Sequence, residues 1–329
     1  MLLGFALTRH CNLRCPHCIR DDVTEVRALP VPLVLRAVDE ARALFGVVTA
    51  SFTGGEPTLH PEWSTLVDAL AARGVPYRFV SNGWHMRRLM PAIDRSPPQA
   101  VRLSLSGATE AIHDDERGRG SFARVLLAVA LLTSRQIPTA LSIVIDRRDR
   151  HQVREAADLA ESLGCTRIHF ILPQPVPGSL ERGSDLSLAE CWAVRREVEA
   201  LAAEPRRTIV QLDWGHPVDA VEEQREDGTP RCATFAGERL YVDPDGQVSL
   251  CCQLSDYGFN RADVVGDLAR ESLGEIWSRY TVRLAKLAEA SRPQGADDAL
   301  AALPCLRCAR SLGKLAWMDA PAHAALAAV

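Results

Sequence analysis

Cysteines at ligand spacings are the residues of this sequence that could carry chemistry. The stretch "TRHCNLRCPHC" places Cys11, Cys15 and Cys18 in the spacing C-x3-C-x2-C, directly after an apolar run. Soft thiolates of this kind select iron–sulfur clusters or zinc. A zinc ion would want a fourth protein ligand, which His10 or His17 could supply. Three cysteines on a four-iron cluster would instead leave one iron free to bind a substrate.

A glycine-rich segment is the second feature of this kind. "FTGGEP" ends the second apolar run and places Gly54 and Gly55 directly before Glu56. The glycines permit close backbone approach, and the carboxylate can accept hydrogen bonds from an ammonium group. Alone, the segment is typical of a glycine turn. Beside the three cysteines, it favours a binding site for a small molecule next to a cluster.

A second set of cysteines lies in the last third of the chain. Its members are spread from a single cysteine, through one that follows Gly246 by five residues, to a C-x2-C pair: Cys232, Cys251, Cys305 and Cys308. Four thiolates could hold a second iron–sulfur cluster or a structural zinc ion. The spacing alone does not separate these two alternatives.

Regular alternation of strands and helices must position the first cysteines. Apolar or alternating runs predict six strands, each followed by a helical pattern, at residues 2–8, 47–53, 75–83, 100–107, 139–146 and 167–173. Such alternation predicts an α/β fold with a parallel sheet. Six strands are too few for a closed eight-stranded barrel, so an open partial barrel or a doubly wound sheet remains.

The pattern changes near residue 206. A loop rich in proline and glycine leads into a helix that Ser187 and Glu190 would cap. Short strands then follow, and "DPDG" before "QVSLCC" is a strong hairpin signal. We therefore predict a first domain over residues 1–205 and a small α+β domain over residues 206–329.

The first cysteine motif and the GGE segment resemble the radical S-adenosylmethionine (radical SAM) superfamily. The resemblance implies a partial (β/α)6 barrel, a [4Fe–4S] cluster on the three cysteines, and a deoxyadenosyl radical made from S-adenosylmethionine. Its cofactor contacts map onto the GGE segment, the "SNG" and "RLSLSGATEAIHDDERGRGSF" stretches and the end of the sixth strand. The residues so implied are Gly54, Gly55, Glu56, Ser81, Asn82, Ser104, Arg117 and Leu172, with backbone near Ile143.

The second cysteine set resembles the twitch domain, a short form of the SPASM extension found on some radical SAM enzymes. The resemblance implies one auxiliary [4Fe–4S] cluster, because the further cysteines of a full SPASM domain are missing after Cys308. Four protein ligands leave no vacant iron, so this cluster would serve electron transfer or structure.

Three cysteines remain outside both sets. Cys165 precedes a strand and reads as a small core residue. Cys191 lies in the first turn of a helix, where the helix N-terminus would lower its pKa. Cys252 follows Cys251, and in an extended strand its side chain would point the other way. We therefore predict that Cys252, or else Cys191, donates a hydrogen atom to a substrate radical.

A spare thiol beside an auxiliary cluster resembles the twitch enzymes of aminoglycoside biosynthesis, a group that includes neomycin C epimerase. The resemblance implies inversion of a sugar or aminocyclitol C–H centre. An aminocyclitol dehydrogenase, a peptide maturase and a non-catalytic iron–sulfur protein are the alternatives. A strand that begins at residue 2 leaves no room for a leader-binding domain, which lowers the peptide alternative. Acidic residues could attract a polycationic sugar: Asp213, Glu238, Asp243, Asp256 and Asp263.

Bulk properties exclude several classes. The formal charge of -4 argues against a nucleic-acid surface, and no apolar run reaches the roughly 18 residues of a membrane span. The first residues lack the basic start of a signal peptide. We therefore expect a cytoplasmic enzyme without membrane or nucleic-acid partners, reduced by a flavodoxin or ferredoxin and acting on an aminoglycoside-like small molecule.

Overall fold

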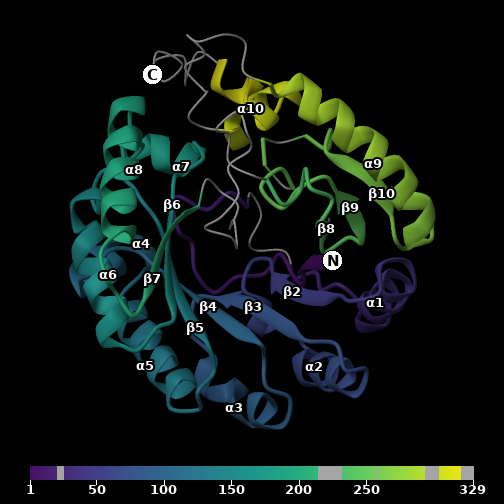
Figure 1. Cartoon of the computed structure of the whole chain (residues 1–329), viewed down its shortest axis with the longest axis horizontal. Coiled ribbons are helices and arrows are strands. Elements are labelled where there is room, and N and C mark those ends of the chain that lie inside the picture. Colours follow the sequence, from purple (N-terminus) through teal and green to yellow (C-terminus); the bar gives the residue numbers. More distant parts are fainter. Residues whose placement is uncertain (21–25, 214–231, 256, 259, 293–303, 320–329) are drawn as a thin grey trace.

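One sheet of ten strands organises the chain (Figure 1). The computed structural model describes residues 1–20, 26–213, 232–255, 257–258, 260–292 and 304–319. The strand order is β10-β9-β8-β1-β2-β3-β4-β5-β6-β7. The strands are β1 (Leu2–Ala6), β2 (Thr49–Thr53), β3 (Tyr77–Ser81), β4 (Ala100–Leu105), β5 (Thr139–Val144), β6 (Arg167–Ile171), β7 (Ile209–Asp213), β8 (Arg239–Val242), β9 (Gln247–Ser249) and β10 (Val264–Asp267).

Strands β1 to β6 pair in parallel with their sequence neighbours, as six crossover units require. The sheet curves into an open barrel whose inner wall is formed by the strands, and the helices cover its outer face (Figure 1). All six strands expected from the sequence are present. The partial barrel is therefore confirmed over a doubly wound sheet, as is the fold class as a whole.

The helices carry the crossovers and the C-terminal part. Short 3₁₀ helices lie at Pro57–Leu59 (η1), Arg150–Gln152 (η2) and Ala316–Asp319 (η3). The α-helices are α1 (Val31–Phe45), α2 (Trp63–Ala72), α3 (Met86–Arg95), α4 (Glu110–Arg117), α5 (Ser121–Thr133), α6 (Val153–Ser162), α7 (Pro177–Glu181), α8 (Leu188–Ala202), α9 (Leu273–Ala290) and α10 (Pro304–Ser311).

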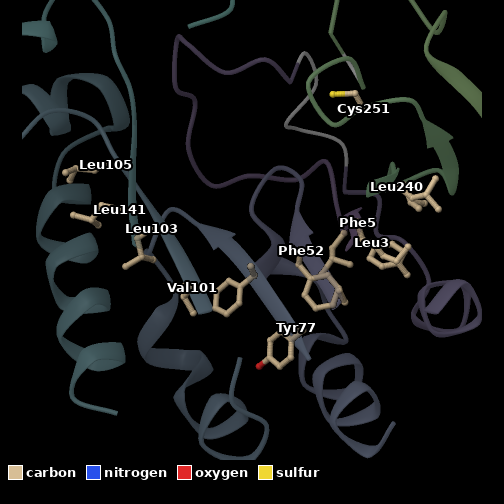
Figure 2. Close-up of a cluster of buried hydrophobic side chains, with 14 of the residues drawn as sticks. Leu3, Phe5, Phe52, Tyr77, Val101, Leu103, Leu105, Leu141, Leu240 and Cys251 are labelled. Atoms are coloured by element: carbon tan, nitrogen blue, oxygen red, sulfur yellow. The ribbon is translucent and has the colours of Figure 1, made fainter. Parts of the chain in front are cut away.

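Alternation along each strand separates the core from the barrel interior. On β4, Val101, Leu103 and Leu105 are fully buried on one side of the sheet (Figure 2). Arg102 and Ser104 lie on the other side and line a cavity inside the barrel. Because successive side chains point to opposite faces of a strand, one strand supplies both the hydrophobic core and the cavity wall.

Two strands beyond the six extend the sheet in parallel at its two sides. Strand β7 pairs with β6, although β7 begins after residue 206. Strand β8 pairs with β1, with Leu2 opposite Arg239. The domain boundary near residue 206 thus falls before a strand that continues the barrel sheet, and the division of the chain there stays a prediction.

The expected hairpin after the barrel is present. Strands β8 and β9 are antiparallel, and the Gly246 amide donates to the Asp243 carbonyl across the "DPDG" turn at 3.0 Å. Gly246 has a φ of +83°, which glycine adopts without steric cost. Strand β9 ends at Ser249, so Cys251 and Cys252 lie after it.

A buried ion pair fastens the segment that follows Cys308. The Lys314 ammonium lies 2.7 Å from Asp263 Oδ1, and both side chains are almost completely buried. Lys314 also donates to the carbonyl groups of Tyr257 and Asn260 at 2.8 Å. After Cys308, the chain is therefore held in place by the buried ion pair of Lys314 and Asp263.

Lys314→Met should strongly destabilise the protein. The change leaves the Asp263 carboxylate buried without its counter-charge, which costs about 3–5 kcal/mol in such sites. Chemical denaturation of the variant measures the lost free energy of unfolding. Lys286→Met, at an exposed position of α9, is the matched control and should change the free energy of unfolding little. An equally small loss for Lys314→Met would contradict the structural role of the pair.

Among the described residues, no helix is both long and apolar enough to cross a membrane.

Candidate active site

The cysteine loop that follows β1 opens onto the barrel cavity. Cys11, Cys15 and Cys18 are partly exposed, and all three line a cavity of about 590 Å³. The Cys18 amide donates to the Cys15 carbonyl at 3.1 Å, which closes a tight turn between these two cysteines. The loop lies at the carboxyl ends of the parallel strands, where barrel enzymes place their chemistry.

The glycines of the GGE segment are required by this loop. A Cβ on Gly54 would lie 2.4 Å from the Thr8 carbonyl oxygen, and one on Gly55 would lie 2.3 Å from that of Arg9. The Gly55 amide donates to the Thr8 carbonyl at 2.8 Å. The Glu56 amide donates to the His10 carbonyl at the same distance. The backbone of the GGE segment is thus hydrogen-bonded to the residues that lead into the cysteine loop.

Gly55→Ala should prevent the first cluster from forming, because the added methyl group displaces the backbone that leads to Cys11. After anaerobic reconstitution, we expect about half of the iron of the parent protein, with the auxiliary cluster retained. Gly274→Ala is the control, since its Cβ would meet only Leu44 at 4.0 Å. Full iron loading of Gly55→Ala would show that the close contact is dispensable.

The Glu56 side chain serves the protein itself. Its Oε1 accepts from the Thr58 hydroxyl at 2.6 Å and from the Ser81 hydroxyl at 2.9 Å. Its Oε2 accepts from the backbone amide of Asn82 at 2.7 Å. Burial raises the pKa of this carboxyl, while these donors oppose that rise. Glu56, which the sequence suggested as an ammonium acceptor, therefore links the GGE segment to the end of β3 through hydrogen bonds.

Polar groups from the end of β3 and from α4 lie beside the cysteine loop. Asn82 Nδ2 lies 3.9 Å from Cys11 Sγ, and Arg117 Nη1 lies 3.7 Å from Cys15 Sγ. Burial raises the pKa of Cys15, and the nearby Arg117 charge lowers it. For Cys11, burial raises the pKa to about 12. A bound metal would have to offset this cost, and the thiolate donor set with its N–H donors suits an iron–sulfur cluster.

The other residues implied as cofactor contacts divide into two groups. Ser81, Asn82, Ser104, Arg117 and Leu172 all line the cavity. The side chain of Ile143, near which a backbone contact was expected, does not line the cavity. It is buried among the hydrophobic side chains on the opposite face of β5. This follows from strand alternation, since its neighbours Ser142 and Val144 are the residues that face the cavity.

Sequence reasoning missed a charged network behind Arg117. His17 Nδ1 lies 2.5 Å from Glu116 Oε1, and His17 Nε2 lies 3.3 Å from Arg117 Nη2. Glu116 also pairs with Arg148. Although burial opposes it, the hydrogen bonds from His17 and Arg148 lower the pKa of Glu116 to about 2. Two features of the sequence could have indicated this network: His17 lies inside the C-x2-C spacing, and Glu116 directly precedes Arg117.

The second cysteine set converges in the C-terminal part. Burial raises the pKa of Cys305 well above its usual value, and the neighbouring thiols of Cys232, Cys308 and Cys252 raise it further. The pKa of Cys251 is raised in the same way, with Cys252, Cys305 and Cys232 as neighbours. Segments far apart in the sequence thus bring their thiols near one another. The C-terminal thiol group is defined here as Cys232, Cys251, Cys252, Cys305 and Cys308, of which Cys251 is buried and the others are partly exposed.

The predicted opposite facing of Cys251 and Cys252 is wrong. Both follow the end of β9 in a turn, where the alternation of a strand does not apply. The neighbouring Cys252 thiol raises the pKa of Cys251, and both residues line the barrel cavity. Cys252 therefore belongs to the C-terminal thiol group, and the argument that made it a separate hydrogen-atom donor fails.

The two other spare cysteines lie away from the cavity wall. Cys165 is buried in the core directly before β6, where the sequence placed it. Cys191 is also a core residue. Burial, together with the nearby Glu190 and Asp185 charges, raises its pKa to about 11. The helix N-terminus therefore does not produce the reactive thiol that its position suggested.

The expected acidic surface is largely used internally. Asp243 is fully buried and pairs with Arg261 at 2.6 Å, and Asp263 pairs with Lys314. Asp256 and the Asp213 side chain lie outside the described residues, and Glu238 has an interaction partner. Internal pairing of Asp243 and Asp263 removes the main basis for attracting a polycationic sugar.

Two family models match the two cysteine-bearing parts of the chain. The Radical SAM superfamily model matches residues 5–160, and the SPASM model, an iron–sulfur cluster-binding domain, matches residues 232–309. The chain carries a radical SAM domain followed by a SPASM domain. The zinc alternatives and the non-catalytic alternative are thereby set aside. The cofactors of this radical SAM enzyme are S-adenosylmethionine and two [4Fe–4S] clusters, as the sequence predicted.

Known proteins similar to this chain include a peptide cyclase and a maturase. The PqqA peptide cyclase of Gluconobacter oxydans is 26% identical over 287 residues, covering 84% of this chain and 76% of that protein. The mycofactocin maturase MftC of Mycobacterium ulcerans is 31% identical over 170 residues, covering 50% of this chain and 45% of that protein. The chain thus spans less than half the length of that maturase.

Solved structures support the fold. SuiB of Streptococcus suis, bound to S-adenosylmethionine, superposes with a TM-score of 0.71 at 16% identity and covers 93% of this chain and 71% of its own. The expectation of an aminoglycoside epimerase and of an aminoglycoside-like partner is wrong, because the similar proteins include a peptide cyclase, a mycofactocin maturase and a bacteriocin biosynthesis protein instead. The spare thiol of Cys252 suggested an epimerase, but it lies beside Cys251 and Cys305 rather than apart from the second cysteine set.

Proposed function

We propose that this radical SAM enzyme modifies a peptide. The observation that carries the proposal is the similarity to the PqqA peptide cyclase, which extends over 84% of the chain. The maturase and bacteriocin-biosynthesis proteins among the relatives support the same class of substrate. The reaction would form a new bond within the peptide at a carbon that first loses a hydrogen atom.

Within this proposal, the cysteine loop after β1 holds the first cluster through Cys11, Cys15 and Cys18. Gly54, Gly55 and Glu56 fix the loop, while Ser81, Asn82, Ser104, Arg117 and Leu172 form the wall that S-adenosylmethionine contacts. When bound, cluster and cofactor supply the carbon radical that removes a hydrogen atom from the substrate. The protein's part is to hold the reacting carbon inside the cavity, away from water.

Formation of a bond between two peptide positions oxidises the peptide by two electrons. One electron leaves with the abstracted hydrogen atom, and the other needs an acceptor while a proton is released. We assign Cys232, Cys251, Cys305 and Cys308 as the ligands of an auxiliary cluster that would serve this purpose. Cys251 also lines the barrel cavity, so such an acceptor would border the space in which the substrate radical forms.

The size of the cavity limits what enters. A volume of about 590 Å³ lies in the ordinary range for small-molecule sites. It therefore takes the cofactor and a few side chains rather than a folded peptide. We infer that a short extended stretch of the substrate reaches into the barrel.

The test uses the reconstituted protein, dithionite, S-adenosylmethionine and a panel of synthetic candidate precursor peptides, with aminoglycosides as the comparison panel. We expect deoxyadenosine release coupled to a peptide that has lost two hydrogen atoms, detected by mass spectrometry. Coupled turnover of an aminoglycoside, with every peptide left unmodified, would contradict the proposal.

A further inference from the structure

The charged network behind Arg117 joins three segments that are far apart in the sequence. His17 belongs to the cysteine loop, and Glu116 directly precedes Arg117 on α4. Arg148 lies between β5 and α6. His17 and Arg117 line the barrel cavity, whereas Glu116 is not among the described residues that do. Glu116 can therefore influence a molecule in the cavity only through its neighbours.

The donor and acceptor atoms of the His17 ring are fixed by its two neighbours. His17 Nε2 lies 3.3 Å from Arg117 Nη2, and it must accept because arginine carries only donors. The ring proton therefore lies on Nδ1, which is 2.5 Å from Glu116 Oε1 and donates to it. The partner of one ring nitrogen sets the role of the other. Glu116 thus selects the form of His17 that can hold the Arg117 guanidinium group.

The remaining contacts of Arg117 aim it along the cysteine loop. Its Nε donates to Ser106 Oγ at 2.7 Å, and its Nη1 lies 3.7 Å from Cys15 Sγ. With Nη2 held by His17, every nitrogen of the guanidinium group has a contact that fixes its direction. Each Nη atom carries a second N–H group that can point to a ligand. A side chain held in this way loses little conformational freedom when it binds.

Arg148 holds the second oxygen of the Glu116 carboxylate. Its guanidinium group pairs with Glu116 Oε2. It also donates to Asp146 Oδ2, through Nε at 3.0 Å and through Nη2 at 2.6 Å, and to Asp115 Oδ2 through Nη1 at 2.7 Å. Because Arg148 is fixed by these carboxylates, Glu116 cannot turn away from His17 without giving up an ion pair.

We propose that Glu116 is a positioning residue for S-adenosylmethionine, which orients Arg117 toward the cofactor through the ring of His17. The inference rests on the proposed function in taking Arg117 as a cofactor contact, and it holds whatever substrate the enzyme modifies. It adds a carboxylate outside the cavity on which the affinity for the cofactor depends. Through Arg148, that affinity is also tied to the segment that follows β5.

The test measures the affinity of the reconstituted chain for S-adenosylmethionine by equilibrium dialysis, without reductant and without peptide. Glu116→Gln keeps the size of the side chain, but it leaves His17 and Arg148 to compete for a single acceptor oxygen. We expect the dissociation constant of the cofactor to rise about tenfold, as the loss of one hydrogen bond to a charged group requires.

A double-variant cycle separates positioning from a general loss of structure. His17→Phe keeps a ring without its nitrogen atoms, and it should raise the dissociation constant by a similar factor. Glu116→Gln/His17→Phe should bind the cofactor no more weakly than His17→Phe alone, because Glu116 acts through the histidine. Independent structural damage at the two positions would instead add up to a rise of about a hundredfold.

Glu110→Gln, at an exposed position in the first turn of α4, is the matched control and should keep the parent affinity. Iron analysis before dialysis shows whether both clusters are loaded. A parent-like dissociation constant in fully loaded Glu116→Gln, or additive effects in the double variant, would overturn the inference. Loss of the first cluster in Glu116→Gln would overturn it as well, because the carboxylate would then support the cysteine loop itself.

These outcomes are independent of the assay of the proposed function, since the dialysis contains no peptide. Weaker cofactor binding by Glu116→Gln, with no further loss in the double variant, supports the positioning role even if no peptide in the product assay is modified. Modification of a precursor peptide, together with parent-like cofactor binding by Glu116→Gln, would support the proposed function and overturn the positioning role.

Discussion

Cys15→Ala should reduce deoxyadenosine formation to the level seen without enzyme. The change removes one of the three thiols of the cysteine loop that line the cavity, and this loop holds no further thiol that could replace it. Without that cluster, no electron reaches S-adenosylmethionine. Chromatography of the acid-quenched reaction measures deoxyadenosine, and iron analysis should show that about one of two clusters remains.

Cys165→Ala is the matched control, because Cys165 is a buried core residue outside both cysteine sets. It should retain both clusters and deoxyadenosine formation, at some cost in stability for the lost packing. Parent-level deoxyadenosine formation by Cys15→Ala would show that the first cluster is held by other residues.

Cys251→Ala should separate the start of the reaction from its completion. The variant is expected to lose the auxiliary cluster and to form deoxyadenosine without releasing modified peptide, because the second electron has no acceptor. The buried Cys251 thiol lies among Cys232, Cys305 and Cys252, so its loss removes a central ligand. Electron paramagnetic resonance of the reduced protein shows which cluster signal is missing.

Cys252→Ala, the neighbouring change, should keep both cluster signals and the modified product. Four thiols of the C-terminal thiol group remain in this variant, which is enough for one four-iron cluster. Loss of the auxiliary signal in Cys252→Ala, with its retention in Cys251→Ala, would reverse the assignment of the ligand.

The sequence predicted the barrel well because its signals are local. Alternating residues such as Val101 and Leu103 against Arg102 report which side of β4 faces the core, and the C-x3-C-x2-C spacing lies within one loop. The structure places both features where the sequence did. The parallel order of the strands follows from the helical crossovers between them.

What failed depended on contacts between distant segments. The opposite facing of Cys251 and Cys252 assumed that β9 continues through them, but the strand ends at Ser249. The acidic residues Asp243 and Asp263 read as a free surface, whereas Arg261 and Lys314 neutralise them in the fold. Charge on a side chain is visible in sequence, and its partner is not.

The pairing of β1 with both β2 and β8 has a consequence for how the chain is made. Leu2–Phe5 leave the ribosome long before Arg239–Val242, so the hydrogen bonds between these two strands can form only late in synthesis. Until then one side of β1 is an open sheet edge, which can pair with another chain. Such a distant pairing is also slow to close, so the nascent first half of this protein is the stage at which chaperones would matter most.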